Sequence, residues 1–111
     1  MATKRVNLRT SKGIELDTDT REHVDERMQR QLKKLGDRAM RATVRFEDLN
    51  GPRGGVDTVC RVKVVLAGLH SIVTEARGSE PREAFDLAAG RAQRAAVRLL
   101  EAARSVRRRA V

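Results

Sequence analysis

The sequence predicts an α/β (α+β) two-layer sandwich, in which a four-stranded sheet carries two helices on one face in the order β-α-β-β-β-α. Two segments repeat apolar residues at steps of three and four, which is typical of helices with one buried face. Four shorter segments alternate apolar and polar residues, which is typical of half-buried strands. The chain has 111 residues, so we expect a single domain over residues 1–111 with one hydrophobic core.

The first two elements are expected to be a strand and a helix. Lys4–Thr10 alternates apolar and polar residues and predicts the strand. A helix N-cap is expected within Asp17–Asp19, because a short side-chain acceptor there can bind a free backbone N–H. The helix is expected to end near Leu35, where Gly36 can adopt the positive φ of a C-terminal cap. Its buried stripe comprises Thr20, Val24, Met28, Leu32 and Leu35.

Three further strands are expected at Ala39–Glu47, Val56–Ala67 and His70–Arg77. The segment Asn50–Gly55 cannot continue a strand and is expected to form a hairpin loop. A right-handed crossover through the first helix places the first two strands parallel, and the rest is a meander. The inward side chains are expected to be Met40, Ala42, Val44, Phe46, Cys60, Val62, Val64 and Leu66. The opposite face carries Arg5, Arg9, Arg41, Arg45, Arg61 and Lys63 and is expected to stay in solvent.

The last third of the chain predicts one long helix over Pro81–Val106, with proline tolerated in the first turn. At about 1.5 Å per residue this helix is about 39 Å long, so its arginine-rich end should extend beyond a sheet of short strands. A basic C-terminal tail is expected at about 104–111. The apolar stripe comprises Phe85, Ala88, Ala92, Ala96, Leu99, Ala103 and Val106. Arg91, Arg94 and Arg98 fall on the opposite side, within a sector of about 60°.

The charge of the chain indicates the class of partner. The formal net charge is +9 and the isoelectric point is about 11.1, which favours a polyanion. From residue 90 to residue 111 there are seven arginines and one acidic residue. A solvated helix face usually mixes charge signs, so we interpret the arginine stripe as one that faces a polyanion. No apolar run approaches membrane-spanning length, and the single Cys60 with no secretory signal at the start favours the cytoplasm.

A second row of cations lies on the first predicted helix. His23, Arg27, Arg30 and Lys34 share one flank of its buried stripe, while acidic residues lie on the other flank. If the basic flank lies beside the arginine stripe, about five or six phosphates could be engaged, which gives a log–log salt slope of around −4 to −5. The candidate phosphate-binding residues are Arg91, Arg94, Arg98, Arg27, Arg30, Lys34, Lys12 and Arg104.

The chain offers few groups for base stacking or catalysis. Phe46 and Phe85 are its aromatic residues, and both are at core-facing positions, so nucleic acid would be bound through phosphate charge and shape. Cys60 lies on the inward strand face, where apolar surroundings raise the pKa of a thiol. A Cys60–His70–Asp57 group would make a poor zinc site. We therefore expect no enzyme activity, no metal, no cofactor and no small-molecule substrate.

Three strings stand out by their order along the chain: Thr10-Ser11-Lys12, Arg21-Glu22-His23-Val24 followed by Arg27, and the helix from Glu80 through Arg98. Their order and spacing resemble the short ribosome-hibernation factors, the group of ribosome-associated inhibitor A and hibernation-promoting factor within the sigma-54 modulation protein family. The resemblance covers roughly residues 5–100. Basic residues stand where that family has them at Arg91, Arg94 and Arg98, while Gly90 stands where the family usually has a better helix former.

This resemblance implies a ribosome-binding protein that occupies the decoding region of the small subunit and blocks translation as a hibernation or stress factor. The candidate residues would then contact phosphates of 16S rRNA. The chain ends soon after the second helix and would lack the dimerisation domain of long hibernation factors, so a monomer is expected. Two alternatives stay open. One is a regulatory protein-interaction module of the sigma-factor modulator type, with its contact on the sheet face or at Val59 and Val65; the other is a non-specific nucleic-acid binder.

Overall fold

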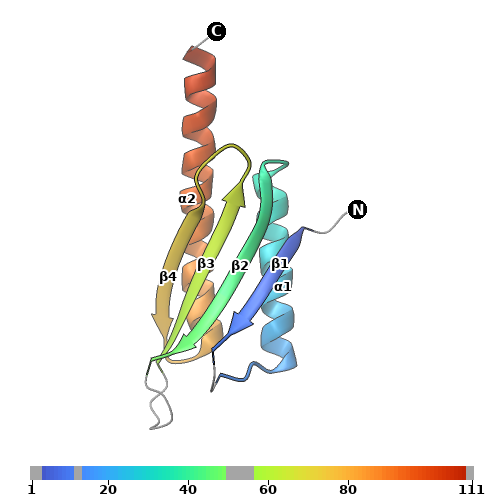
Figure 1. The fold of residues 1–111 in the computed structure, drawn as a ribbon, viewed down its shortest axis with the longest axis vertical. Helices are drawn as coiled ribbons and strands as arrows, with labels where there is room; N and C mark the ends of the chain where they lie inside the picture. Colours follow the sequence, from blue (N-terminus) through green and yellow to red (C-terminus); the bar gives the residue numbers. More distant parts are fainter. Residues whose placement is uncertain (1–3, 12–13, 50–56, 110–111) are drawn as a thin grey trace.

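The computed structural model describes residues 4–11, 14–49 and 57–109. Its elements follow the order β-α-β-β-β-α, as the sequence predicts (Figure 1). Strand β1 comprises Arg5–Thr10 and helix α1 comprises Thr18–Leu35. The remaining elements are β2 at Ala39–Asp48, β3 at Thr58–Leu66, β4 at Ile72–Gly78 and α2 at Pro81–Arg109. The expected hairpin loop at 50–55 and the candidate Lys12 lie outside the described residues.

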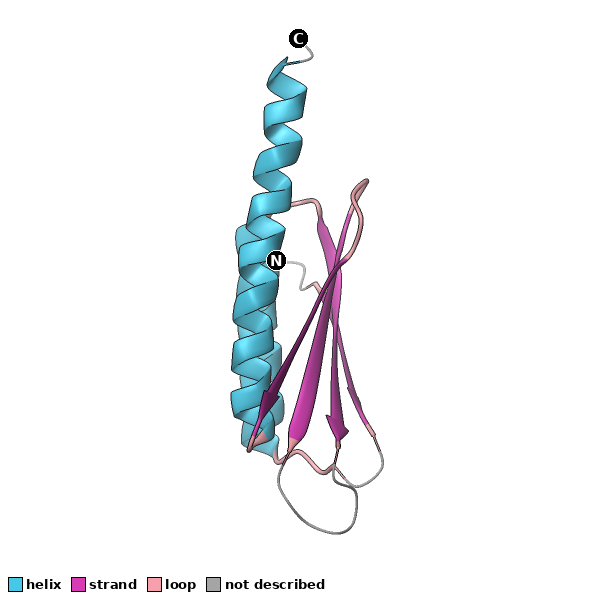
Figure 2. Ribbon diagram, turned by 90° about the vertical axis from the view of Figure 1, so that its left-hand side faces the viewer, coloured by secondary structure: helices cyan, strands magenta, loops and turns pink. Residues whose placement is uncertain are grey.

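The four strands form one sheet in the order β1-β2-β3-β4. Strands β1 and β2 are parallel, while β2 with β3 and β3 with β4 are antiparallel. Both helices lie on one face of the sheet, and within the described part of the chain no helix lies on the other face (Figure 2). The α+β sandwich expected from the sequence is therefore confirmed.

Helix α1 begins and ends as its terminal residues require. The Asp17 carboxylate accepts a hydrogen bond of 2.7 Å from the backbone N–H of Thr20. The interaction with Thr20 lowers the pKa of Asp17, because the hydrogen bond favours the charged form. At the other end, Gly36 has φ +89° and ends the helix, a conformation that side chains with a Cβ rarely adopt.

The core lies between the helices and the inner face of the sheet. Helix α1 contributes Val24, Met28 and Leu32, and Phe85 of α2 is completely buried beside them. Helix α2 otherwise packs with small side chains, which allow its backbone to lie close to the strands. The fully buried alanines of this helix are Ala84, Ala88, Ala89, Ala92 and Ala96.

Two expectations about the core were wrong, and Thr20, Leu99 and Ala103, which were also expected in buried stripes, are only partly buried. Met40 was expected to point inward, but its side chain is 50% exposed, because the β2–β3 register shifts between Ala39 and Arg41. This irregularity adds one residue to β2, so Ala39 takes the inner position instead. Val106 was expected on the buried stripe of the last helix, but it is 67% exposed.

The exposure of Val106 follows from the length of α2. The helix continues past the end of the sheet, and no other strand or helix of the described residues lies beside its C-terminal turns (Figures 1 and 2). The last buried residue of α2 is Leu100, which replaces the expected Leu99 at the point where the helix leaves the core. Arg104 and the arginines that follow it lie on this overhanging segment, and residues 104–109 are helical.

Candidate nucleic-acid interface

The two helices run side by side in the same direction, because both begin at the same end of the sheet (Figure 1). Between them lies a groove of about 350 Å³. Four of the described residues that line it are cations, and none of those lining residues is a carboxylate. The lining residues are Arg27, Arg30, Gln31 and Lys34 from α1 with Gly90, Gln93 and Arg94 from α2. The basic flank of α1 thus faces Arg94 of α2.

The register of the two helices is fixed by Gln31 at the floor of this groove. Its side-chain NH2 group donates a hydrogen bond of 3.1 Å to the carbonyl oxygen of Ala89 and another of 3.3 Å to Oε1 of Gln93. Its own Oε1 accepts a hydrogen bond of 2.9 Å from Nε of Arg27. Gln31 is only 8% exposed, so its amide has lost most of its contact with water. These internal hydrogen bonds replace the ones that it would make with water in the unfolded chain.

A second polar contact joins the helices nearer their N-termini. Oδ1 of Asp86 lies 2.7 Å from Nε2 of His23 and 2.9 Å from Nη1 of Arg27. Partial burial acts to raise the pKa of Asp86, but the hydrogen bonds from His23 and Arg27 outweigh it and lower the pKa. The His23 ring meets Phe85 edge to face at 5.7 Å, and the Arg27 guanidinium lies 5.9 Å from the same ring. Of the candidate residues, Arg27 is therefore partly neutralised by a carboxylate.

Most of the other candidate cations are exposed and can bind an external anion. Arg30, Lys34, Arg94, Arg98 and Arg104 are exposed. The ion pairs found among the described residues involve none of these five side chains. Guanidinium groups with no internal carboxylate partner are suited to bidentate contacts with phosphate.

Arg91 has a different position from its two neighbours in the predicted stripe. Its Nη1 donates a hydrogen bond of 2.8 Å to the backbone carbonyl oxygen of Glu75 on the edge strand β4. Arg94, in contrast, lines the groove beside α1. The arginine stripe therefore spreads over the exposed side of α2, with one end at the sheet edge and the other at the helix pair.

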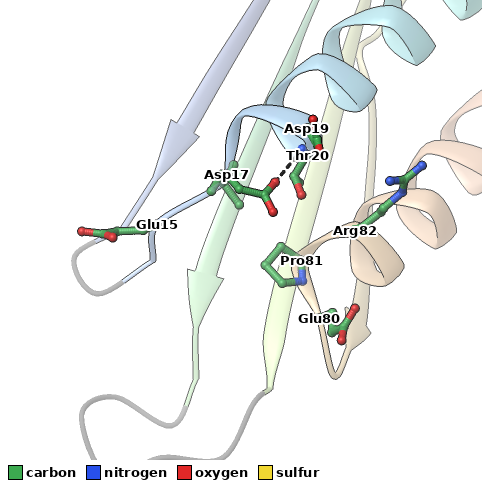
Figure 3. A pocket seen from close by; sticks show the side chains of 8 residues that line it. Glu15, Asp17, Asp19, Thr20, Glu80, Pro81 and Arg82 are labelled. Atoms are coloured by element: carbon green, nitrogen blue, oxygen red, sulfur yellow. Dashed lines mark hydrogen bonds between the residues drawn. The ribbon is translucent and has the colours of Figure 1, made fainter.

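The end of the molecule where both helices begin is acidic. Glu15, Asp17, Asp19 and Glu80 lie around this end together with Arg82 (Figure 3). Carboxylates are favourable at helix N-termini, where the backbone N–H groups carry partial positive charge. The candidate interface therefore begins beyond this acidic end and extends toward the C-terminal ends of the helices.

The groups weighed for catalysis are not assembled into a site. Cys60 is buried against the helices, and loss of solvent raises the pKa of its thiol to about 12. It pairs with Ala76, whereas His70 is exposed near the opposite end of the same two strands. No cluster of three or more metal-ligating side chains occurs in the described part of the chain. None of its described helices is long and apolar enough to cross a membrane.

Sequence reasoning missed three residues of this interface. Gln31 and Asp86 each stand directly beside a residue of a predicted buried stripe, Leu32 and Phe85, and such polar neighbours are where helix pairs place their hydrogen bonds. Gly90 was noted only as a poor helix former. A Cβ at this position would lie 3.5 Å from Arg94 and 3.6 Å from Arg27, so Gly90 marks the place where guanidiniums of both helices meet.

The fold and this surface together define a small α+β domain with a basic helix pair on one face of a four-stranded sheet. A family model described as "Sigma 54 modulation protein / S30EA ribosomal protein" matches residues 9–104. The chain belongs to this family. The resemblance identified in the sequence is thereby confirmed.

Solved structures show the same fold. A structure described as a ribosomal subunit interface protein from Coxiella burnetii has a TM-score of 0.68 at 12% identity, covering 87% of this chain and 98% of the other. The Thermus thermophilus Protein Y N-terminal domain has a TM-score of 0.70 at 18% identity, covering 86% and 98%. A search of curated protein sequences found no match.

Proposed function

We propose that this protein binds the small ribosomal subunit through its helix pair, occupies the decoding region and blocks translation while bound. It would act as a cytoplasmic hibernation or stress factor, without catalysis. The family includes a ribosomal protein by description, and one similar structure is described as a ribosomal subunit interface protein. These names support the ribosome as partner, and the helix surface supplies the chemistry that rRNA requires.

The observation that carries this proposal is the groove between α1 and α2. It holds Arg30, Lys34 and Arg94 without a carboxylate among its described lining residues, and Arg98 lies exposed further along α2. A row of fixed cations along two parallel helices matches the repeated charges of a phosphate backbone better than it matches the single charged centre of a compact anion. Both phenylalanines are completely buried and the chain has no Trp or Tyr, so none of these side chains can stack on bases.

The first test replaces Arg30, Arg94 and Arg98 together by Gln and measures co-sedimentation with purified small subunits. Loss of three phosphate contacts should reduce the steepness of the log–log salt dependence by about 2 to 3 and weaken binding by about tenfold or more. Stability should stay within about 0.5 kcal/mol of the original, because the three side chains are exposed. Unchanged co-sedimentation would remove the helix pair as the binding surface.

Two neighbouring lysines provide a matched control. Lys34 lines the groove, whereas Lys33 is exposed next to it and does not. Lys34→Gln should weaken binding to the subunit more than Lys33→Gln, although each removes one charge. Equal effects would mean that net charge, and not the groove, determines binding, as expected of a non-specific nucleic-acid binder.

A competition experiment tests the decoding region itself. Small subunits loaded with mRNA and tRNA should bind the protein less well than empty subunits, and the protein should reduce synthesis in a purified translation system. If loaded and empty subunits bind it equally, the protein binds elsewhere on the ribosome. If it binds a sigma factor but no subunit, the regulatory alternative is correct.

A further inference from the structure

The face of the sheet that faces away from the helices carries a second array of positive charge. Seven cations point outward from the four strands, and all are exposed. Two carboxylates accompany them, Glu47 and Glu75. Neither helix of the described residues covers this face (Figure 2). The seven cations, which we name the sheet array, are Arg5, Arg9, Arg41, Arg45, Arg61, Lys63 and Arg77.

The strand register places several of these cations directly beside one another. Arg9 pairs with Arg45, and Arg45 pairs with Arg61, so three arginines lie in one row across β1, β2 and β3. Arg5 likewise pairs with Arg41. Neighbouring strands are about 4.8 Å apart, and like charges at such positions destabilise a sheet.

Internal ion pairs offset only part of this repulsion. Nε of Arg45 lies 3.0 Å from Glu47, and Nη2 of Arg61 lies 2.9 Å from Glu75. The ion pairs found among the described residues involve no other member of the sheet array. The face therefore has an excess of positive charge that the fold itself does not neutralise.

Protection of sheet edges explains only a minority of these residues. Charged side chains on an edge strand prevent pairing with other chains, and β1 is an edge that carries Arg5 and Arg9. Strands β2 and β3, in contrast, are paired on both sides. Arg41 and Lys63 on those central strands have no edge to protect, so an external anion is the better explanation for them.

We propose that the sheet array binds the sugar–phosphate backbone of a second RNA segment, so that the domain lies between two RNA segments, one on each face. This inference rests on the proposed function, because it adds a second rRNA contact to that of the helix pair. A protein partner fits less well, since protein interfaces are enriched in aromatic residues and depleted of charge at their centre. Both phenylalanines of this chain are completely buried.

The test compares two variants that each lose three positive charges. In the sheet variant, Arg9, Arg41 and Lys63 become Gln; none of the three belongs to a described ion pair. In the helix variant, Arg30, Arg94 and Arg98 become Gln. An RNA duplex of roughly 16 base pairs is immobilised, protein is added, and capture of a second, fluorescent duplex is measured.

If the protein has two RNA-binding faces, the unchanged protein should capture the second duplex. Each variant should bind the immobilised duplex but capture at least about fivefold less of the second. The steepness of the salt dependence of binding to small subunits should fall by about 2 to 3 in the sheet variant. The inference is overturned if the sheet variant captures the second duplex as well as the unchanged protein does and shows the same salt dependence.

The two proposals fail in different ways. If the helix variant loses subunit binding and the sheet variant behaves as the original, the sheet array is not an RNA site while the helix site stands. If the sheet variant loses subunit binding and the helix variant does not, the helix site is wrong and the sheet array is the interface.

Thermal unfolding separates binding from folding. Removal of like charges from one face should leave the melting temperature of the sheet variant unchanged or higher. The charge-preserving variant Arg9→Lys, Arg41→Lys serves as a second control and should retain capture of the second duplex. A sheet variant that unfolds more easily, together with loss of capture in the Lys variant, would mean that these arginines serve the fold and not RNA.

Discussion

Asp86 is the residue where folding and binding have opposite requirements. Its carboxylate joins α1 to α2 through His23 and Arg27, which supports the geometry of the groove. The same carboxylate neutralises one guanidinium beside a surface that we propose to bind phosphate. Because its side chain is 40% exposed, the contribution of the pair to stability is reduced by solvent screening to about 1 kcal/mol.

The variant Asp86→Asn should separate these two effects. The pKa of Asp86 is lowered in the folded protein, so its stabilisation is complete above the ordinary pKa of a carboxyl and is lost as the pH falls through the folded value. The variant should be less stable than the original by about 1 kcal/mol at pH 7. This difference should shrink as the pH falls below the ordinary pKa of a carboxyl group and through the lower pKa of the folded protein.

Urea unfolding at several pH values measures this difference directly. Binding to small subunits should not weaken in the same variant, because Arg27 is released. A stability difference independent of pH would mean that the carboxylate charge is not what matters at this position.

At the scale of the elements, α2 combines an alanine-rich buried side with a glycine in its middle. The alanines let the helix approach the strands, and Leu100 is where its buried side ends. Gly90 does not serve this packing, since an added Cβ would meet only side-chain ends at ordinary contact distance. A glycine inside a helix lowers stability by about 1 kcal/mol relative to alanine.

Gly90→Ala should therefore raise the free energy of unfolding by about 0.5 to 1 kcal/mol and the melting temperature by roughly 4 °C. The matched control is Gly36→Ala, at the end of α1. There φ is +89°, so a Cβ is strained and stability should fall by about 1 kcal/mol. Differential scanning calorimetry distinguishes the two. A less stable Gly90→Ala variant would show that the groove floor is more tightly packed than these distances indicate.

At the scale of the whole molecule, the sign of the surface charge differs from one region to another. The ends of both helices nearest their N-termini are acidic, while the helix groove, the overhanging end of α2 and the sheet array are basic. A long-range field of this kind orients the molecule as it approaches a polyanion and increases the association rate at low salt. The molecule is elongated, with extents of 58 × 28 × 17 Å.

This distribution predicts RNA binding with little sequence preference. Affinities for single-stranded poly(A) and poly(U) should agree within about fivefold, because no Phe, Tyr or Trp side chain is exposed to stack on bases. The log–log salt slope should be about −4 or steeper. Fluorescence anisotropy over a range of salt concentrations measures both. A strong preference for one homopolymer would indicate base recognition and contradict a purely phosphate-directed surface.

Much of the fold follows from local patterns. The alternation in β3, the stripe of α1 and the caps at Asp17 and Gly36 depend on neighbours within a few positions, and the structure has them where the sequence predicts them. Met40 and Val106 were misplaced for a different reason. Strand alternation assumes an unbroken register, and a helical stripe assumes a sheet beside every turn. Neither assumption can be checked within a single segment.

The sequence by itself determined the element order, the apolar side of each helix, the positive charge and the family resemblance, because each depends on residue types and short spacings. Only the tertiary structure decided that the basic flank of α1 faces α2, that Asp86 ties Arg27, that Arg91 turns to the sheet edge, and that three arginines of the sheet array lie in one row. These are contacts between residues far apart in the chain. They depend on how helices and strands are oriented against one another, which periodicity within one segment does not specify.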